Sequence, residues 1–420
     1  MVTNEVDFVF DGKKLLAKKG DTIASALWRN GIKVITRSIK FHRPRGLHCG
    51  TGDCPNCLAN VNGIPNVRTC MTYVEDGMVV IPQNKFLSRN FDPLGILDFI
   101  YAEGFDYQHR FIRPRFASGF YQRIIRRMTG RGRLPTATVE TKPPSRSNPD
   151  LLIIGNEPAG QRVAEICSSE KDLEIVIVKK GDAEKEFTQK SIGPENVITL
   201  SRSSLVGAFD DGCIGVVSDG RLLIFKSRAV CLAEVGREMP LRFVNWELPG
   251  IIRSSAADRL LKAGITLGNH IVLVGETRRA VRFADMIIDP GQPISTVLCD
   301  DRGRREYLRC GWHIKRAIGR NKLRKIEILN GDWHETIRCD CLITFGPIVP
   351  DIELARQLGC EISSPRNAAP RVSVDDRFET SVKGVFALGC SIGQIDSLKS
   401  MRDASVAAEA ILNRLRRMGR

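Results

Sequence analysis

The pattern of apolar and polar residues predicts a small mixed domain at the N-terminus. Residues 6–15, VDFVFDGKKL, alternate apolar and polar side chains around an Asp-Gly pair, which is typical of a β-hairpin. Asp21 or Thr22 can cap a helix that runs through IASALWRN and stops at the next glycine. Two later strands are expected at residues 66–71 and 78–81. This order of elements is that of a β-grasp ferredoxin domain.

From residue 150 onward the pattern changes to that of an α/β domain. DLLIIG is a buried strand, GNEPAGQRVAEI opens a helix, and LEIVIVKK is the next strand, so the three predict a βαβ unit with a Rossmann-like turn. HIVLVGETRRAVRFADMI begins a second strand–turn–helix unit. The stretch DDRFETSVKGVFALGC, followed by a helical run through MRDASVAAEAILNRL, resembles the closing segment of flavoproteins with two dinucleotide-binding domains.

The expected fold class is α+β plus α/β. A β-grasp, ferredoxin-like domain is followed by a Rossmann-like fold of the flavoprotein type, which has two dinucleotide-binding domains. The stretch RGRLPTATVETKPPSRSNP has the proline and polar content of a linker between them. The predicted parts are a ferredoxin-like domain (1–100), an Arg-rich connecting segment (101–147), a degenerate FAD/NAD(P)-binding domain (148–245 and 350–420) and a second dinucleotide-binding-like domain inserted in it (246–349).

The start of the chain, its apolar runs and its cysteines together indicate the cellular compartment in which the protein is expected. The opening MVTNEVDFVF has no basic region followed by an apolar one, and no run approaches 18 uninterrupted apolar residues. We therefore expect a cytoplasmic protein with no signal peptide and no transmembrane segment. The 13 cysteines are an odd number at irregular spacing, which argues against a disulfide framework.

The net charge of +15 implies attraction to an acidic partner. Basic residues gather between positions 110 and 133, with aromatic residues interleaved. No nucleic-acid-binding motif accompanies them, so we expect no nucleic-acid partner. Two interpretations of the basic stretch remain, namely a solvated basic face and a docking surface for an acidic partner subunit.

Four cysteines carry the clearest chemical signal. The first three are spaced C-x4-C-x2-C and the fourth follows after twelve intervening residues, which is the plant-type spacing of a [2Fe–2S] cluster. Gly50 and Gly52 suit the tight loop that such a cluster needs. Zinc and disulfides are the alternatives, but zinc sites favour two C-x2-C pairs and disulfides do not suit a cytoplasmic chain. The predicted ligands are Cys49, Cys54, Cys57 and Cys70.

The stretch SIKFHRPRGLHCGTGDCPNCLANVNGIPNVRTC resembles the [2Fe–2S] domain of multi-subunit amine and amino-acid dehydrogenases. That group includes hydrogen cyanide synthase, opine and hydroxyproline dehydrogenases, and the α subunit of heterotetrameric sarcosine oxidase. HRPRG, at His42–Gly46, is the most specific part of the resemblance, because generic ferredoxins lack it. His42 and His48 flank the cysteine loop, where either can make a hydrogen bond to the cluster or to backbone.

The flavin signature is damaged. In the first turn Glu157 stands between Gly155 and Gly160, where the G-x-G-x-x-G pattern has a glycine that lets backbone approach a diphosphate. Lys179 falls where an acid for the ribose hydroxyls is expected. The turn that begins at Gly275 also lacks its middle glycine. Two further departures lie at Ala233-Glu234-Val235, in place of an ATG-like motif, and at Cys390, in place of a late aspartate.

Two interpretations of this degenerate site stay open. Either the domain is kept as a scaffold with an empty pocket, or it holds another nucleotide, or FAD in a changed pose, with Lys179 receiving a phosphate. The predicted cofactor-binding residues are therefore Gly155, Gly160, Lys179 and Gly275, and no catalytic residue is predicted.

Together, the spacing and the resemblance predict an electron-transfer subunit of an oxidoreductase that acts on CH–NH donors. The resemblance implies an FAD-containing catalytic partner subunit that oxidises an amine or amino acid, and a further electron acceptor downstream. One alternative is a stand-alone NAD(P)H-using iron–sulfur reductase. Another is a non-catalytic assembly or redox-sensing protein.

Overall fold

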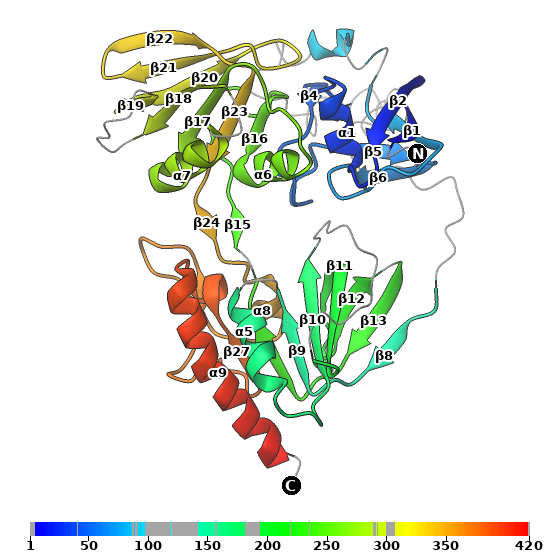
Figure 1. Ribbon diagram of the computed structural model, residues 1–420, viewed down its shortest axis with the longest axis vertical. Helices are drawn as coiled ribbons and strands as arrows, with labels where there is room; N and C mark the ends of the chain where they lie inside the picture. The colour runs from blue at the N-terminus through cyan, green and yellow to red at the C-terminus, as the bar shows by residue number, and fades with distance from the viewer. Residues whose placement is uncertain are drawn as a thin grey trace. The chain divides into compact units, whose positions relative to one another are not determined.

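The computed structural model describes residues 5–39, 41–85, 88, 91–96, 119, 142–155, 158–180, 194–218, 220–234, 236–288, 291, 293–299 and 307–418. The chain divides into two compact units, Met1–Thr138 with Pro240–Gly346, and Val139–Met239 with Pro347–Arg420 (Figure 1). The four-part division of the sequence stays a prediction. The Arg-rich part of its connecting segment, with the proposed basic docking surface, lies almost entirely outside the described residues.

The N-terminal part of the first unit is a five-stranded sheet in the order β2-β1-β7-β5-β6, with α1 packed against it. The predicted hairpin forms, and its turn residues Asp11 and Gly12 both have positive φ, at 52° and 77°. The Oγ1 of Thr22 accepts a hydrogen bond from the backbone N–H of Ser25 at 3.2 Å, which caps α1. The elements are β1 (Glu5–Phe10), β2 (Lys13–Lys18), α1 (Ile23–Arg29), β3 (Thr36–Arg37), β4 (Pro44–Arg45), β5 (Leu58–Val61), β6 (Ile64–Arg68), β7 (Met78–Pro82) and a 3-10 turn, η1 (Pro93–Gly95).

The strand predicted at residues 66–71 is only partly correct. Strand β6 begins earlier, at Ile64, and ends at Arg68, so Cys70 lies in the turn that follows it. Thr69 still pairs with Cys57, because its backbone N–H and its hydroxyl both donate to the Cys57 carbonyl oxygen, at 3.3 and 2.8 Å. The chain then turns, with the Met71 N–H donating to the Arg68 carbonyl oxygen at 2.9 Å.

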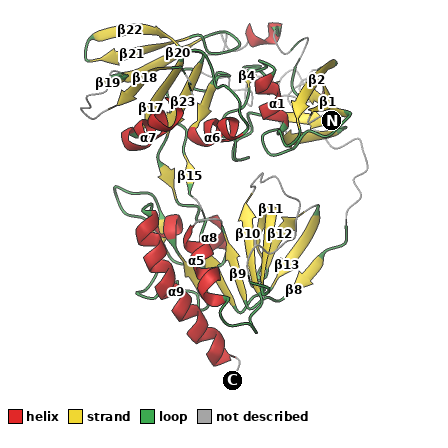
Figure 2. Ribbon diagram, in the orientation of Figure 1, coloured by secondary structure: helices red, strands yellow, loops and turns green. Residues whose placement is uncertain are grey.

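The Pro240–Gly346 part of the first unit is a layered α/β structure. Its parallel sheet, β16-β23-β17-β18-β19, carries helices α6 and α7 on one face (Figure 2). The antiparallel sheet β20-β21-β22 packs on the other face. The elements are β16 (Ile251–Arg253), α6 (Ser254–Lys262), β17 (Ile271–Gly275), α7 (Thr277–Ile288), β18 (Ile294–Cys299), β19 (Leu308–Cys310), β20 (His313–Ile318), β21 (Lys325–Asn330), β22 (Trp333–Arg338) and β23 (Cys341–Phe345).

These two parts of the first unit share one hydrophobic core. Phe8, Ile23 and Leu27 of the ferredoxin-like part belong to the same buried cluster as Ala256 and Leu260 of α6. Burial of apolar side chains is the main stabilising contribution to a fold, so the two parts are expected to unfold together.

The second unit is built on an eight-stranded sheet, β27-β14-β9-β10-β11-β12-β13-β8. Helices α5 and α9 cover one face, while α8 packs on the other (Figure 1). The predicted strand–helix–strand run and the closing strand and helix all form. The elements are β8 (Ser145–Ser147), β9 (Leu151–Ile154), α5 (Pro158–Cys167), β10 (Ile175–Lys180), β11 (Val197–Ala208), β12 (Ile214–Ser218), β13 (Arg221–Phe225), β14 (Ala229–Leu232), β15 (Arg237–Glu238), β24 (Ile348–Val349), α8 (Glu353–Gln357), β25 (Ile362–Ser363), β26 (Arg371–Val372), β27 (Val385–Ala387), a 3-10 turn η2 (Gly389–Ile392) and α9 (Ser397–Met418).

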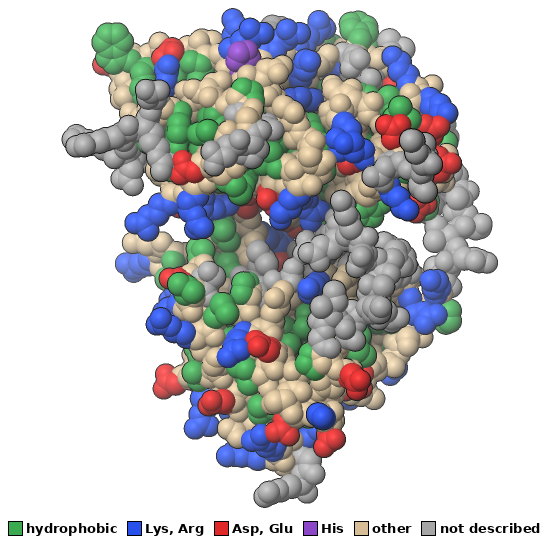
Figure 3. All heavy atoms as spheres, viewed as in Figure 1, with side chains coloured by type: hydrophobic (Ala, Val, Ile, Leu, Met, Phe, Trp, Pro, Cys, Tyr) green, Lys and Arg blue, Asp and Glu red, His purple; other side chains and the backbone are tan. Residues whose placement is uncertain are grey.

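The surface agrees with the basic composition. On the face shown in Figure 3, Lys and Arg side chains are spread over both units. No helix among the described residues is long and apolar enough to cross a membrane.

Candidate metal centre

The four predicted cysteine ligands come together around one loop, residues 49–57, which we call the cluster loop. Cys57 immediately precedes β5, and Cys70 follows β6 by two residues. Because β5 and β6 pair antiparallel with Leu58 opposite Arg68, these two cysteines lie at the same end of the ladder. Gly50 and Gly52 have φ of 72° and 77°, so the loop uses the left-handed conformation that glycine accepts at little cost.

The four thiols lie close to one another. Cys49 interacts with Cys54 and with Cys70, and Cys57 interacts with Cys70. These interactions lower the pKa of Cys49 and of Cys57, and they raise the pKa of Cys54 and of Cys70. A [2Fe–2S] cluster takes four thiolates, two on each iron, so four neighbouring thiols can supply its full ligand set.

Burial also fits this centre. Cys49, Cys57 and Cys70 are 0%, 1% and 2% exposed, whereas Cys54 is half-buried near the tip of the loop. Within the described part of the chain, no group of three or more His, Cys, Asp or Glu side chains is already arranged to hold a metal ion.

The two flanking histidines bond to the protein. His42 Nδ1 lies 2.9 Å from the Asp92 carboxylate, and the Arg37 guanidinium Nε is 3.8 Å from the same group. His48 Nδ1 lies 3.1 Å from the Ile251 carbonyl oxygen, and burial lowers the pKa of His48 to about 4. At neutral pH the His48 ring is therefore uncharged and donates Nδ1–H to Ile251.

The HRPRG motif attaches the ferredoxin-like part to the Pro240–Gly346 part. The Arg45 guanidinium lies 2.8 Å from the Glu247 carboxylate. A Cβ at Gly46 would lie 2.1 Å from the Lys33 carbonyl oxygen and 3.2 Å from Pro249 Cβ, so only glycine fits there. The motif therefore docks one part of the unit on the other and supplies no ligand.

Sequence reasoning missed the residues of α6 that contact the cluster loop. Ser255 Oγ donates to the Cys49 carbonyl oxygen at 2.7 Å, and Arg253 N–H donates to the His48 carbonyl oxygen at 2.8 Å. The Gly50 backbone packs on Ala256. Some 200 residues separate the partners in sequence, and the only local signal is the run of small residues SSAA at the start of α6.

The predicted nucleotide-binding glycines occupy strand–helix turns. Gly155 immediately follows β9 and has φ of 124°, and a Cβ there would lie 1.9 Å from the Ala233 carbonyl oxygen. A Cβ at Gly160 in α5 would lie 2.9 Å from Ala233 Cβ, so this glycine permits close helix–strand packing. Lys179 lies in β10 and is half-buried. Glu157 and Val235 lie outside the described residues.

Other departures from the flavin pattern are buried. Glu234 is 7% exposed and Cys390 is 3% exposed. Cys390 lies against Gly236, where an added Cβ would come 2.3 Å from its sulfur. These side chains occupy space beside the end of β14.

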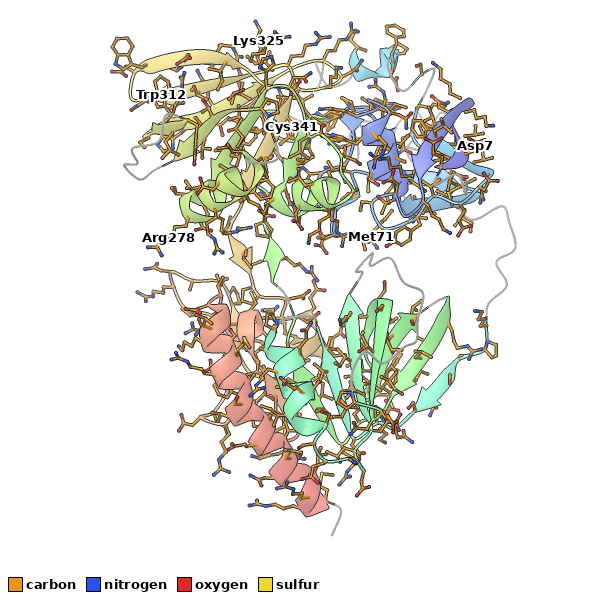
Figure 4. The ribbon with its side chains drawn as sticks, viewed as in Figure 1. Asp7, Met71, Arg278, Trp312, Lys325 and Cys341 are labelled. Atoms are coloured by element: carbon orange, nitrogen blue, oxygen red, sulfur yellow. The ribbon has the colours of Figure 1, made fainter. Side chains whose placement is uncertain are left out.

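In the second turn, Gly275 has φ of 126°, and a Cβ there would lie 2.1 Å from the Phe345 carbonyl oxygen. Arg279, in the first turn of α7, donates to the Gly346 carbonyl oxygen at 2.7 Å and to Ser254 Oγ at 3.1 Å. Its neighbour Arg278 is exposed (Figure 4).

Residues 3–85 match the family described as the 2Fe-2S iron-sulfur cluster binding domain. Over nearly its whole length, 98%, the chain is 26% identical to the alpha subunit of sarcosine oxidase from Rhizobium meliloti (strain 1021). It spans about half of that relative, 46% of its length. It is 22% identical to the opine oxidase A subunit of Agrobacterium tumefaciens (strain Ach5), over 63% of this chain and 65% of that one.

A shorter stretch of the chain, 77 residues, is 32% identical to hydrogen cyanide synthase subunit HcnA of Pseudomonas aeruginosa, over 18% of this chain and 73% of that protein. The resemblance stated from the sequence is thereby confirmed.

Among solved structures, L-proline dehydrogenase from P. horikoshii superimposes with a TM-score of 0.70 at 18% identity, covering 98% of this chain and 74% of that one. This likeness confirms the fold class, an N-terminal [2Fe–2S] domain followed by a Rossmann-like reductase fold. The chain thus carries, at residues 3–85, a member of the 2Fe-2S iron-sulfur cluster binding domain family, and it is homologous to the sarcosine oxidase alpha subunit, to the opine oxidase A subunit and to HcnA.

Proposed function

We propose that this chain is the iron–sulfur electron-transfer subunit of a heteromeric, flavin-dependent amine or amino-acid dehydrogenase or oxidase. Cys49, Cys54, Cys57 and Cys70 are its cluster ligands. The observation that carries the proposal is the gathering of these four thiols at one loop and the adjacent turn, inside a domain of the [2Fe–2S] family. A bound [2Fe–2S] cluster would supply one-electron chemistry, which suits relay between a flavin and an acceptor.

The homologues support an amine or amino acid as the electron donor. The relatives from sarcosine oxidase and opine oxidase are named as subunits of oxidases of amine compounds. We infer that the C–N bond is oxidised on a partner subunit that holds FAD, because this chain departs from a flavin pattern at Glu157, at Lys179 and at two later positions. The two electrons of that oxidation then pass through this chain one at a time.

The cluster loop has one open side. Cys54 is half-buried, and Asp53, its neighbour in the chain, is exposed, as is Arg68. The side chains of Arg68 and Met71 pack against Gly52 in the same loop (Met71 is labelled in Figure 4). The other three cysteines are shielded from water. We therefore infer that electrons enter or leave at the Cys54 side, where a partner can approach closely.

Purification of the native complex tests the proposal. The untagged protein, isolated from its own cells, is expected to copurify with a flavoprotein, and its iron is expected to be reduced when that flavoprotein is reduced. Isolation of the chain by itself, with iron but without any flavoprotein, would favour the assembly or redox-sensing alternative. Oxidation of NADPH or NADH by the isolated chain would favour the reductase alternative.

The chain expressed alone is expected to carry little or no FAD. In the first turn, diphosphate would have to approach the Glu157 carboxylate, and the ribose would meet Lys179 in place of an acid. Each change costs roughly 1–3 kcal/mol, so affinity falls by about tenfold or more for each. Denaturing the purified chain and measuring released flavin against iron checks this. Near-stoichiometric FAD would mean that the pocket compensates for both substitutions.

A further inference from the structure

Helix α6 begins against the cluster loop. Ser255, its second residue, donates a hydrogen bond from Oγ to the Cys49 carbonyl oxygen at 2.7 Å. A Cβ at Gly50 would lie 2.7 Å from Ala256 Cα and 3.1 Å from its backbone nitrogen. The N-cap residue, Arg253, makes no side-chain capping hydrogen bond to the helix. The N-terminal end of α6 thus lies directly against the backbone of a ligand cysteine and its neighbour.

The direction of α6 is fixed at its other end as well. Arg29 Nη2 donates to the Ala263 carbonyl oxygen, the C-cap of α6, at 2.8 Å. The same guanidinium bonds to both carboxylate oxygens of Asp21, each at 3.0 Å. Between the two ends, Ala256 and Leu260 are buried in the core shared with the ferredoxin-like part. The helix is therefore held with its N-terminal end at the cluster loop.

A helix N-terminus carries a partial positive charge, because the backbone N–H groups of its first turn have no intrahelical acceptor. Reduction adds one negative charge to a [2Fe–2S] cluster, and nearby charges and hydrogen bonds set how readily this occurs. We propose that α6 is an electrostatic part of the cluster centre, and that its N-terminal end, positioned by Ser255, raises the reduction potential of the cluster. This inference rests on the proposed cluster ligands but not on the proposed partner or donor.

An acidic substitution at Ser255 tests the proposal in the full chain. Ser255→Asp opposes the helix dipole beside the cluster, so at a fixed ambient potential the ratio of reduced to oxidised cluster should fall about tenfold, or about 59 mV for a one-electron couple. Ser255→Ala loses the hydrogen bond to Cys49 and should lower the ratio by roughly two- to threefold. The measurement is an EPR-monitored redox titration, with the iron and labile-sulfide content of each variant.

The matched control is Lys262→Glu, an acidic substitution at the exposed, C-terminal end of the same helix. Lys262→Glu changes the net charge by two units, whereas Ser255→Asp changes it by one. Because position 262 lies about 10 Å further along the helix from the cluster loop, the ratio of reduced to oxidised cluster should change less than twofold. Equal potentials for the parent and Ser255→Asp, with iron fully retained, would overturn the proposal while leaving the cluster assignment intact. If Ser255→Asp fails to load iron, Ser255→Ala decides alone, and an unchanged potential there overturns the proposal.

Discussion

Replacing Cys54 with serine is expected to remove the [2Fe–2S] cluster or to leave only a small fraction of it. The parent chain should contain about two irons and two labile sulfides, with a rhombic EPR signal after reduction. Cys54 is the most exposed ligand, so its loss also opens the centre to water. Serine is a poor substitute because the hydroxyl is far less acidic than a thiol and binds iron weakly as a neutral group.

The matched control is Cys360→Ser. Cys360 is a buried thiol that lies in the second unit and donates to Thr380 Oγ1 at 3.4 Å. This variant should keep the full iron content and an unchanged EPR spectrum. A full complement of iron in the Cys54 variant would refute the ligand assignment.

The second large effect is expected from Gly50→Ala. The Cβ added at position 50 would lie 2.7 Å from the Ala256 Cα, which is too close for two carbon atoms. The φ of 72° at this position is also unfavourable for alanine. The backbone term costs about 1–2 kcal/mol, and overpacking against backbone adds roughly 1–3 kcal/mol. We expect a less stable first unit and faster loss of iron, measured by denaturant titration and by the rate of cluster bleaching.

Gly12→Ala separates the two causes. Gly12 has φ of 77°, close to that of Gly50, but nothing lies within 4 Å of an added Cβ in the hairpin turn. This variant should lose only the backbone term, about 1–2 kcal/mol, and should keep its cluster. Equal effects of the two substitutions would show that α6 does not press on the cluster loop.

Local patterns in the sequence predicted most of the elements correctly. The alternation before Asp11 predicted the first hairpin, and Thr22 caps α1 as expected. The error at β6 arose because a turn, closed by the Met71 N–H on the Arg68 carbonyl oxygen, ends the strand before Cys70. The hydrophobic pattern indicates which face of a strand is buried, but it does not indicate where the chain will turn away from the ladder.

The cysteine spacing sufficed to predict the cluster domain because all four predicted ligands lie within 22 residues, in one loop and in the turn after β6. The contribution of α6 could not be predicted in the same way. Ser255 and Cys49 lie far apart in the sequence and form a hydrogen bond only in the folded chain. Patterns in a single sequence carry no information about such pairs. The role of HRPRG as a docking motif was hidden for the same reason, because Glu247 lies 200 residues beyond it.

Anaerobic reduction of the native complex tests the central claim most directly. The complex would be mixed with sarcosine or L-proline as probe donors, and also with chemically reduced flavoprotein partner, and the iron followed by EPR. If this chain transfers electrons, the signal of the reduced [2Fe–2S] cluster appears once the partner's flavin is reduced, and it is absent when Cys54 is serine. A complex whose flavin is reduced while the intact cluster stays oxidised, at an ambient potential below that of the cluster, would contradict the account.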